Sequence, residues 1–343
     1  MTNNPSKTEF LTVSSENAEI SRGSNRSGHG NAHSYFEKYA LVGLLALIFA
    51  IAYLLLPTFR SPNVIGAIVN SQAIILLLAL TATIVLRTGD FDLSIAGVMV
   101  TSGATVGVLS SSGTPLIVAI IAGLLVGLIS GTVNAILVVK IGVESFITTI
   151  GMFTALTGLG YAITNSRVIT DIPPVLSEVA RFKLIGLPVT TWIGILLAIA
   201  LWYVYEKTPL GRYLVFIGGN REASKLVGIN VTRVRMGAFI ASGLIASFIG
   251  ILLVGNLGAV DPSIGNQYLL SPFAAVFLGA TAITVGRFNS LGTVVALYLL
   301  AVGFTALQIM GAPSWVNNVF NGLALMLAVA LAKIVSNRNS VKK

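Results

Sequence analysis

The chain has 343 residues, of which 55% are hydrophobic and only 10% are charged, and its formal net charge is +9. A soluble globular domain needs about 25% charged residues to cover its surface, so this composition excludes a soluble fold. The absence of cysteine excludes disulfides and thiolate metal sites, and basic residues in a membrane protein are first of all topology signals.

The first 37 residues are rich in Ser, Asn and Gly. They lack the apolar core of a signal peptide, and we expect a disordered cytoplasmic arm over 1–37. His29 and His33 stand four residues apart in this arm, but the chain has no further histidine. We interpret the pair as chance and predict no metal site.

From residue 38 onward the chain contains repeated apolar runs of about 20 residues, the length that crosses a bilayer as a helix. We predict an all-α, polytopic transmembrane bundle over 38–336 with about ten spans, and counts of eight or nine are also compatible with the pattern. Residues 337–343 form a basic tail. The predicted spans are 40–56, 64–86, 95–113, 115–139, 145–164, 185–205, 237–256, 267–286, 291–310 and 317–336.

The basic residues predict the orientation, because Lys and Arg favour the cytoplasmic side. With the N-terminus inside, ten spans place all 21 Lys and Arg in the cytoplasm except Arg60, Arg167, Arg181 and Lys183. We therefore expect both termini and the loop 206–236 in the cytoplasm, and the loop 165–184 outside.

Small and polar residues inside the spans predict contacts between helices. Gly123, Gly127 and Gly131 form a small-xxx-small pattern that permits close helix packing, although glycine is abundant, at 35 copies. The second and tenth spans carry amides at membrane depth, which either bond neighbouring helices or line a hydrophilic path. These candidate pathway residues are Asn70, Gln72, Asn318 and Asn321.

The stretch "GDFDLS" at 89–94 places two acidic residues at the start of the third span. The simplest interpretation of Asp90 and Asp92 is a solvated helix end. The alternative is that Asp92 caps the third helix and fixes its start through Ser94.

The stretch "LGRYLVFIGGNREASKLVGI" at 210–229 predicts a short helix inside the cytoplasmic loop. Gly218 and Gly219 supply a tight turn, Asn220 is a good N-cap, Glu222 suits the first turn, and Gly228 is a typical helix stop. Ala223, Leu226 and Val227 share one apolar face. So short a helix is marginal alone, and either the membrane surface or a cytoplasmic protein must hold that face.

Several chemistries find no support in the sequence. There is no G-x-x-x-x-G-K-[ST] loop for nucleotide phosphates and no H-E-x-x-H or G-x-S-x-G motif, so we do not expect an enzyme. Carboxylates at mid-depth, which a proton-driven carrier would use, are scarce.

Three stretches together resemble one family. The stretch at 210–229 is similar to the "GRY…GGN…A…L.GI" signature of permease subunits of ribose-type sugar importers in the ATP-binding cassette superfamily. "TGDFDLSIAGVMV" at 88–100 and "ESFITTIGMFTALTGLGY" at 144–161 resemble two further segments of that family, in matching order and spacing. Two departures stand out: Asp90 and Phe91 replace the usual Gly-Ile, and "LGATAITVGRFNSLG" lacks the family's glycine pairs.

The resemblance implies a permease subunit of a bacterial inner-membrane importer that moves a monosaccharide or related solute by alternating access. It implies a separate cytoplasmic ATP-binding subunit docked on 206–236, a second permease subunit, identical or related, and an extracytoplasmic solute-binding protein, with no nucleic acid and no cofactor held by this chain. The alternatives are a permease for a branched-chain amino acid or signalling molecule, an ATP-independent secondary carrier, and a non-transporting scaffold.

Overall fold

The computed structural model describes residues 29–313 and 315–341, with side chains over 38–313 and 315–331. The described chain is helical almost throughout, and β1 (Lys183–Leu184) and β2 (Leu187–Pro188) form a small antiparallel hairpin. The longer helices are α2 (His29–Leu55), α4 (Ala73–Leu86), α5 (Ser94–Ser111), α6 (Leu116–Ala135), α7 (Ser145–Ile163), α9 (Val189–Lys207), α12 (Val231–Leu257), α13 (Gln267–Gly279), α14 (Ser290–Ile309) and α15 (Trp315–Val341). The shorter ones are η2 (Pro57–Arg60), α3 (Pro62–Ser71), η3 (Ile136–Ile141), α8 (Pro174–Arg181), α10 (Pro209–Gly219), α11 (Arg221–Leu226) and η4 (Pro262–Asn266).

Eight helical segments in the described part of the chain are long and apolar enough to cross a membrane. They confirm an all-α polytopic bundle, with α3 and α4 together forming the second span. The predicted span 267–286 is too long, because α13 already ends at Gly279. The side chain of Asn289 explains this end: its amide donates to the carbonyls of Gly279 and Ala282, which holds the following turns in place. Among the residues with described side chains, the apolar part of α15 covers Trp315–Leu331, less than the 18 residues of the shortest of the eight spans.

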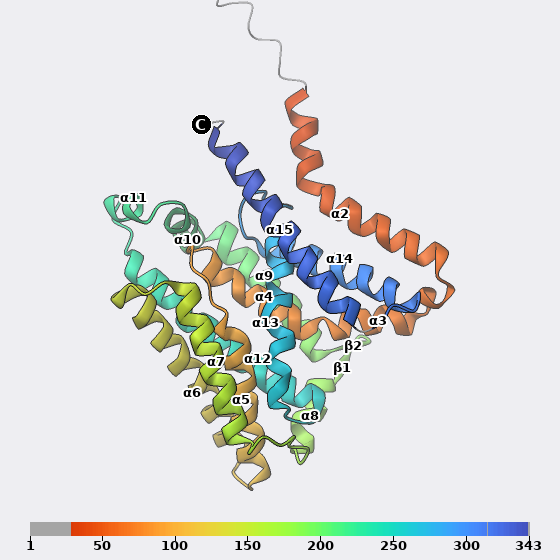
Figure 1. Ribbon diagram of the computed structural model, residues 1–343, viewed down its shortest axis with the longest axis vertical. Helices are drawn as coiled ribbons and strands as arrows, with labels where there is room; N and C mark the ends of the chain where they lie inside the picture. Colours follow the sequence, from red (N-terminus) through yellow and green to blue (C-terminus); the bar gives the residue numbers. More distant parts are fainter. Residues whose placement is uncertain (1–28, 314, 342–343) are drawn as a thin grey trace, which may run out of the picture.

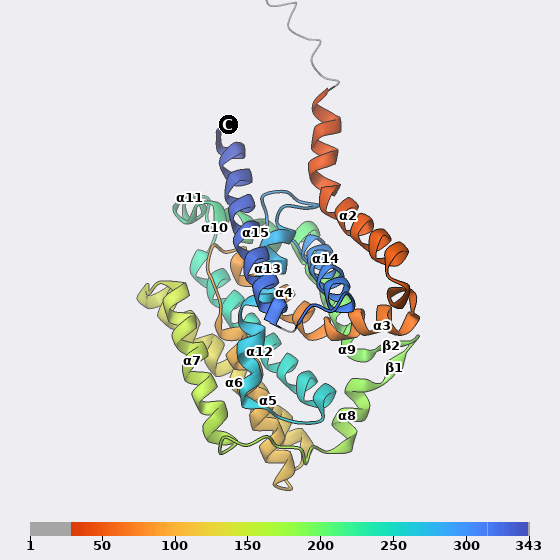
Figure 2. The same cartoon turned by 45° about the vertical axis from the view of Figure 1, so that its right-hand side comes forward.

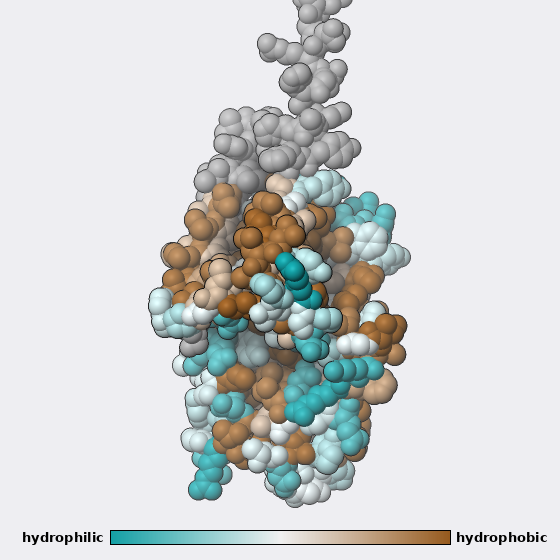
Figure 3. Space-filling model, turned by 90° about the vertical axis from the view of Figure 1, so that its right-hand side faces the viewer, coloured by the Kyte–Doolittle hydropathy of each residue, from teal (hydrophilic) through white to brown (hydrophobic). Residues whose placement is uncertain are grey.

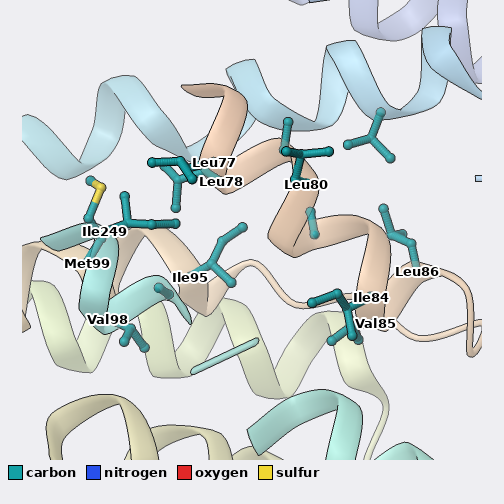
Figure 4. Close-up of a cluster of buried hydrophobic side chains, with 14 of the residues drawn as sticks. Leu77, Leu78, Leu80, Ile84, Val85, Leu86, Ile95, Val98, Met99 and Ile249 are labelled. Carbon is teal, nitrogen blue, oxygen red and sulfur yellow. The ribbon is translucent and has the colours of Figure 1, made fainter. Parts of the chain in front are cut away.

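Helices α4 and α5 lie at the centre of the bundle. All residues of α4 except Ile75 are buried, and α4 packs against α9, α12, α13 and α14. Helix α5 packs against α6, α7 and α12. Leucines of α4 and Ile95, Val98 and Met99 of α5 meet Ile249 of α12 in one apolar cluster (Figure 4). Such a helix, apolar on all sides, is stable only when other helices surround it.

The outer helices carry apolar residues to the surface, as expected where lipid replaces water. Exposed large hydrophobic residues occur along α2, α6, α7, α9 and α15. Figure 3 shows one side of the molecule, on which hydrophobic side chains form broad surface patches.

The predicted glycine pattern in α6 is confirmed. A Cβ at Gly127 would lie 2.2 Å from the carbonyl oxygen of Gly243, and one at Gly131 would lie 2.7 Å from that of Phe239, both in α12. A Cβ at Gly123 would meet Val106 and Ser102 of α5. These three positions therefore let α6 approach α12 and α5 at backbone distance.

The two ends of the bundle carry different elements. Helices α10 and α11 lie at the end where α2 begins and α15 finishes, and α8 with the β-hairpin lies towards the opposite end (Figures 1 and 2). The loop 165–184 is thus partly helical, and α8 packs on α12. Helix α2 begins at His29, so the last residues of the arm predicted to be disordered over 1–37 are helical; residues 1–28 and 342–343 lie outside the described chain.

Candidate functional site

The predicted short helix exists as α11, and its two ends are those expected. The side chain of Asn220 accepts from the backbone N–H of Ala223 at 3.0 Å, and Gly228 has φ +83, which favours glycine. The predicted Gly-Gly turn is wrong: Gly218 and Gly219 are the last residues of helix α10. Gly218 serves close packing instead, because a Cβ there would lie 2.4 Å from the carbonyl oxygen of Arg87.

Helix α11 presents an apolar face to the outside. The exposed fraction is 89% for Leu226 and 74% for Val227, and Ala223 is exposed beside them, while Ser224 on the other side is buried. Glu222 and Lys225 form an exposed ion pair at 2.8 Å along the helix. Such a face with no covering residues in the described chain suits contact with a partner or with the membrane surface.

Asp90 joins three segments that lie far apart in the sequence. It is 2% exposed and receives two bonds from Arg235 of α12, at 2.7 and 2.8 Å, and one from Arg221 of α11, at 2.8 Å. Thr88 donates a further bond to it. Arg221 also donates to the backbone carbonyls of Thr88 and Gly89. These charge-assisted hydrogen bonds replace the hydration that the buried carboxylate has lost.

Asp92 is equally buried, so the interpretation of this acidic pair as a solvated helix end is wrong. Its Oδ1 accepts from the backbone N–H of Ser94, at 3.1 Å, and from the Ser94 hydroxyl, at 2.5 Å. Its Oδ2 accepts from Ser242 of α12 at 2.7 Å, and Asn134 of α6 donates to the Ser94 hydroxyl at 2.8 Å. Burial raises the pKa of the Asp92 carboxyl, and the bonds from Ser94 and Ser242 oppose that rise in part.

The backbone of the same loop is also bonded to α7. Phe91 N–H donates to the Ser145 hydroxyl and Leu93 N–H to the Thr149 hydroxyl, each at 3.1 Å. The segment 89–94 therefore contacts α6, α7, α11 and α12 through specific polar groups, which fixes the start of α5 relative to all four helices.

A cavity of about 540 Å³ lies between the break that separates α3 from α4, the start of α13, the middle of α14 and the start of α15. Gln72 stands at the break itself, between the two helices. The hydrophilic lining consists of neutral groups, and two further aromatic rings, Phe304 and Trp315, also face the cavity. The polar lining residues are Gln72, Gln267, Tyr268, Ser271, Asn317, Asn318 and Asn321.

Three of the four predicted pathway residues therefore converge on one cavity, and Asn70 does not. The hydrogen bonds that the structure gives to the three are local: Gln72 donates to Ser71, and Asn321 donates to Asn317 one turn earlier. The Asn70 side-chain oxygen is buried without a partner. Among the described residues, none of these amides is hydrogen-bonded to a neighbouring helix.

Several residues that line the cavity or bond Asp90 were not predicted from the sequence. Gln267, Tyr268, Ser271 and Asn317 line the cavity, but they stand near helix starts, where polar residues are ordinary. The i, i+4 spacing of Asn317 and Asn321 was the available signal for a polar helix face. The positive charges of Arg221 and Arg235 predict only the orientation of the chain, and no local pattern in the sequence indicates that both side chains bond Asp90.

Comparison with known proteins places the chain in a family. The family described as "Branched-chain amino acid transport system / permease component" matches residues 64–329. The ribose import permease protein RbsC of Escherichia coli (strain K12) is 30% identical over 297 residues, which cover 85% of this chain and 92% of that protein. RbsC of Bacillus subtilis (strain 168) is 32% identical over 292 residues, 84% of this chain and 90% of the relative.

A fructose import permease protein, FrcC of Rhizobium meliloti, is 30% identical over 309 residues, 87% of this chain and 86% of the relative. No solved structure matches the chain significantly. The match to the family covers most of the chain and includes both the 89–94 loop and the α10–α11 region. The chain therefore belongs to this family of permease components of transport systems, and within it is similar to ribose-type import permeases.

Proposed function

We propose that this chain is the permease subunit of an ATP-driven importer and that its solute is a monosaccharide or a similar small, neutral, polar molecule. The chain is a multi-pass protein of the bacterial inner membrane, as its family and its eight apolar helices indicate. Relatives named for ribose and fructose import support a sugar as the solute.

The observation that carries the proposal is the chemistry of the 540 Å³ cavity. Amide and hydroxyl groups both donate and accept hydrogen bonds, as the hydroxyl groups of a sugar require. Tyr268, Phe304 and Trp315 add aromatic surface for the apolar face of a sugar ring. A branched-chain amino acid carries an ammonium and a carboxylate, and no charged residue belongs to the described lining. The cavity therefore favours a sugar over that alternative.

The energy source and the partners follow from the permease role. In this proposal ATP is hydrolysed by a separate cytoplasmic subunit, which covers the apolar face of α11, and this chain has neither a nucleotide site nor a cofactor of its own. A second permease subunit, identical or related, completes the path, and an extracytoplasmic binding protein delivers the solute. The exposed Leu226 and Val227 support the docking role of α11.

The test is transport by the complete complex of permease, ATPase and binding protein in proteoliposomes. We expect ATP-dependent uptake of ribose or fructose and none of leucine. Replacing Gln72 by Ala removes a donor and an acceptor from the cavity and should lower uptake about three- to tenfold, the effect of one hydrogen bond.

Asn70→Ala is the matched control, because Asn70 precedes the same helix break but does not line the cavity. Its uptake should stay at the level of the unchanged protein. Equal effects of the two substitutions, or uptake of leucine in preference to both sugars, would contradict the proposal.

A further inference from the structure

We propose that α4 is the rigid element that carries movement of the α10–α11 region to the cavity, and that two contacts join α4 to this region. One is the ion pair of Arg221 with Asp90, and the other is the backbone contact of Gly218 with Arg87. The inference rests on the proposed docking of the ATPase on α11, and it identifies the helix through which movement of α11 would reach the cavity.

The ionic contact connects α11 to the loop that follows α4. Arg221 is the first residue of α11, and its guanidinium bonds the Asp90 carboxylate and the carbonyls of Thr88 and Gly89. All three acceptors lie within four residues of the end of α4 at Leu86. Movement of α11 therefore pulls directly on the chain that leaves α4.

The backbone contact connects α10 to α4 itself. Gly218, in the last turn of α10, approaches the carbonyl of Arg87, the C-cap residue of α4, so closely that a Cβ would lie 2.4 Å from its oxygen. The neighbouring Gly219 is also helical, and a Cβ there would meet nothing within 4 Å. Of the two glycines, only Gly218 is required by a close approach.

Helix α4 has the properties of a rigid connection. It contains 14 residues, which corresponds to a length of about 20 Å, and neighbouring helices enclose it on all sides. Close packing resists bending, so displacement at one end is transmitted to the other. The residue before its first turn is Gln72, which lines the cavity. One helix thus runs from the α10–α11 contacts to the proposed solute site.

Asp90, Arg221 and Arg235 differ in burial, and this difference determines which of them can be substituted without unfolding the protein. Removing Asp90 would leave Arg235 buried without its carboxylate, and removing one partner of a buried pair is strongly destabilising. Removing Arg221 leaves the Asp90–Arg235 pair intact, and the Arg221 side chain is 38% exposed. Arg221→Ala therefore breaks the connection without disrupting the fold, and Gly218→Ala separates the backbones independently.

The experiment measures, for the complete complex in proteoliposomes, co-purification of the ATPase and the amount of sugar taken up per ATP hydrolysed. We expect Arg221→Ala and Gly218→Ala to retain the ATPase but to lower uptake per ATP about fivefold or more, the lower end of coupling between protein sites. Lys225→Ala removes the same charge from α11, and Gly219→Ala makes the same change one residue away; both should behave as the unchanged protein.

Two results distinguish an error in the proposed function from an error in the role of α4. If the unchanged permease does not retain an ATPase, the proposed function is wrong. If the ATPase is retained and uptake per ATP is the same in Arg221→Ala as in Lys225→Ala, and in Gly218→Ala as in Gly219→Ala, then α4 is not the connection. Loss of the folded protein in Gly218→Ala leaves the comparison of Arg221→Ala with Lys225→Ala to decide.

Discussion

The carboxylate of Asp92 holds together three helices through hydroxyl groups. Ser94 of α5 and Ser242 of α12 both donate to it, and Asn134 of α6 reaches the cluster through Ser94. Burial raises the pKa of Asp92 and so disfavours its charged form, whereas the hydrogen bonds from Ser94 and Ser242 favour it. What the neighbouring groups need is a pair of polar atoms at this position.

Substitutions at Asp92 separate these two properties. Asp92→Asn keeps one acceptor oxygen for Ser94 and can donate to the Ser242 hydroxyl, so we expect nearly unchanged stability and uptake. Asp92→Leu leaves two buried hydroxyl groups and one backbone N–H without their partner, at about 1–3 kcal/mol each, and should unfold or inactivate the permease. Thermal unfolding in detergent and uptake in cells measure both. Similar behaviour of the two variants, each correctly inserted, contradicts a capping role.

Residue types in the sequence predicted local roles well and distant partners poorly. Asn220 and Gly228 have the cap and stop roles that their types indicate, because both depend only on neighbouring backbone. The sequence predicts a turn at Gly218, but glycine suits turns and close packing equally, and only the fold brings Arg87 against it. The bond from Arg235 to Asp90 spans 145 positions along the chain, a separation at which no spacing rule operates.

At the scale of elements, α11 is the clearest match between a sequence pattern and a structure. Its six residues make too few internal bonds to be stable alone. Arg221 bonds it to Asp90, Ser224 is buried on its inner side, and Leu226 faces outward. A helix fixed on one side and apolar on the other has the form of a docking element. The membrane surface remains the alternative partner for the same face.

A charge at Leu226 distinguishes the two partners. Leu226 is 89% exposed, so Leu226→Asp should not affect folding or insertion. If an ATPase covers this side chain, the loss of about 1.5–3 kcal/mol of apolar burial should weaken co-purification at least tenfold and remove solute-stimulated ATP hydrolysis. Gly228→Val, at φ +83, should do the same by misdirecting the end of the helix.

The exposed Lys225→Ala variant controls for a surface change on the same helix. Retention of the ATPase together with stimulated hydrolysis in Leu226→Asp would exclude α11 as the docking element. Altered lipid association with unchanged ATPase binding would identify the membrane as its partner.

Longer elements were predicted where hydropathy alone decides them. The first seven spans have helices close to the expected positions, because about 20 apolar residues permit little else in a bilayer. The eighth predicted span begins with α13 but ends too late, because apolar residues continue past Gly279 and hydrogen bonds from Asn289 fold them into turns. The break at Gln72 was not predicted either, because apolar residues continue on both sides of the polar residues 70–72 and the whole segment has the length of one span.

In the whole molecule, the predicted cytoplasmic loop and the predicted outer loop lie at opposite ends of the bundle. Helix α11 and the start of α12 lie at the end of the bundle where α15 finishes (Figure 1), and they carry the basic residues Arg221, Lys225, Arg233 and Arg235. The loop 165–184 lies at the other end of α12, because Ile169 forms a β-bridge with Val260 just after that helix. Because basic residues favour the cytoplasm, we predict that α11 and both termini face inward and that 165–184 faces outward.

Single cysteines in this cysteine-free chain test that orientation. Ser166 in the outer loop and Thr232 in the first turn of α12 are both exposed, so accessibility to a thiol reagent depends only on the side of the membrane. An impermeant maleimide should label Ser166→Cys in intact cells and Thr232→Cys only after the membrane is opened. The reverse pattern would show that the protein has the opposite orientation in the membrane. The apolar face of α11 would then lie outside the cell, where no cytoplasmic ATPase can reach it. Equal labelling of both in intact cells would place the two segments on the same side of the membrane. That result would contradict the fold, in which one span, α9, separates Ser166 from Thr232.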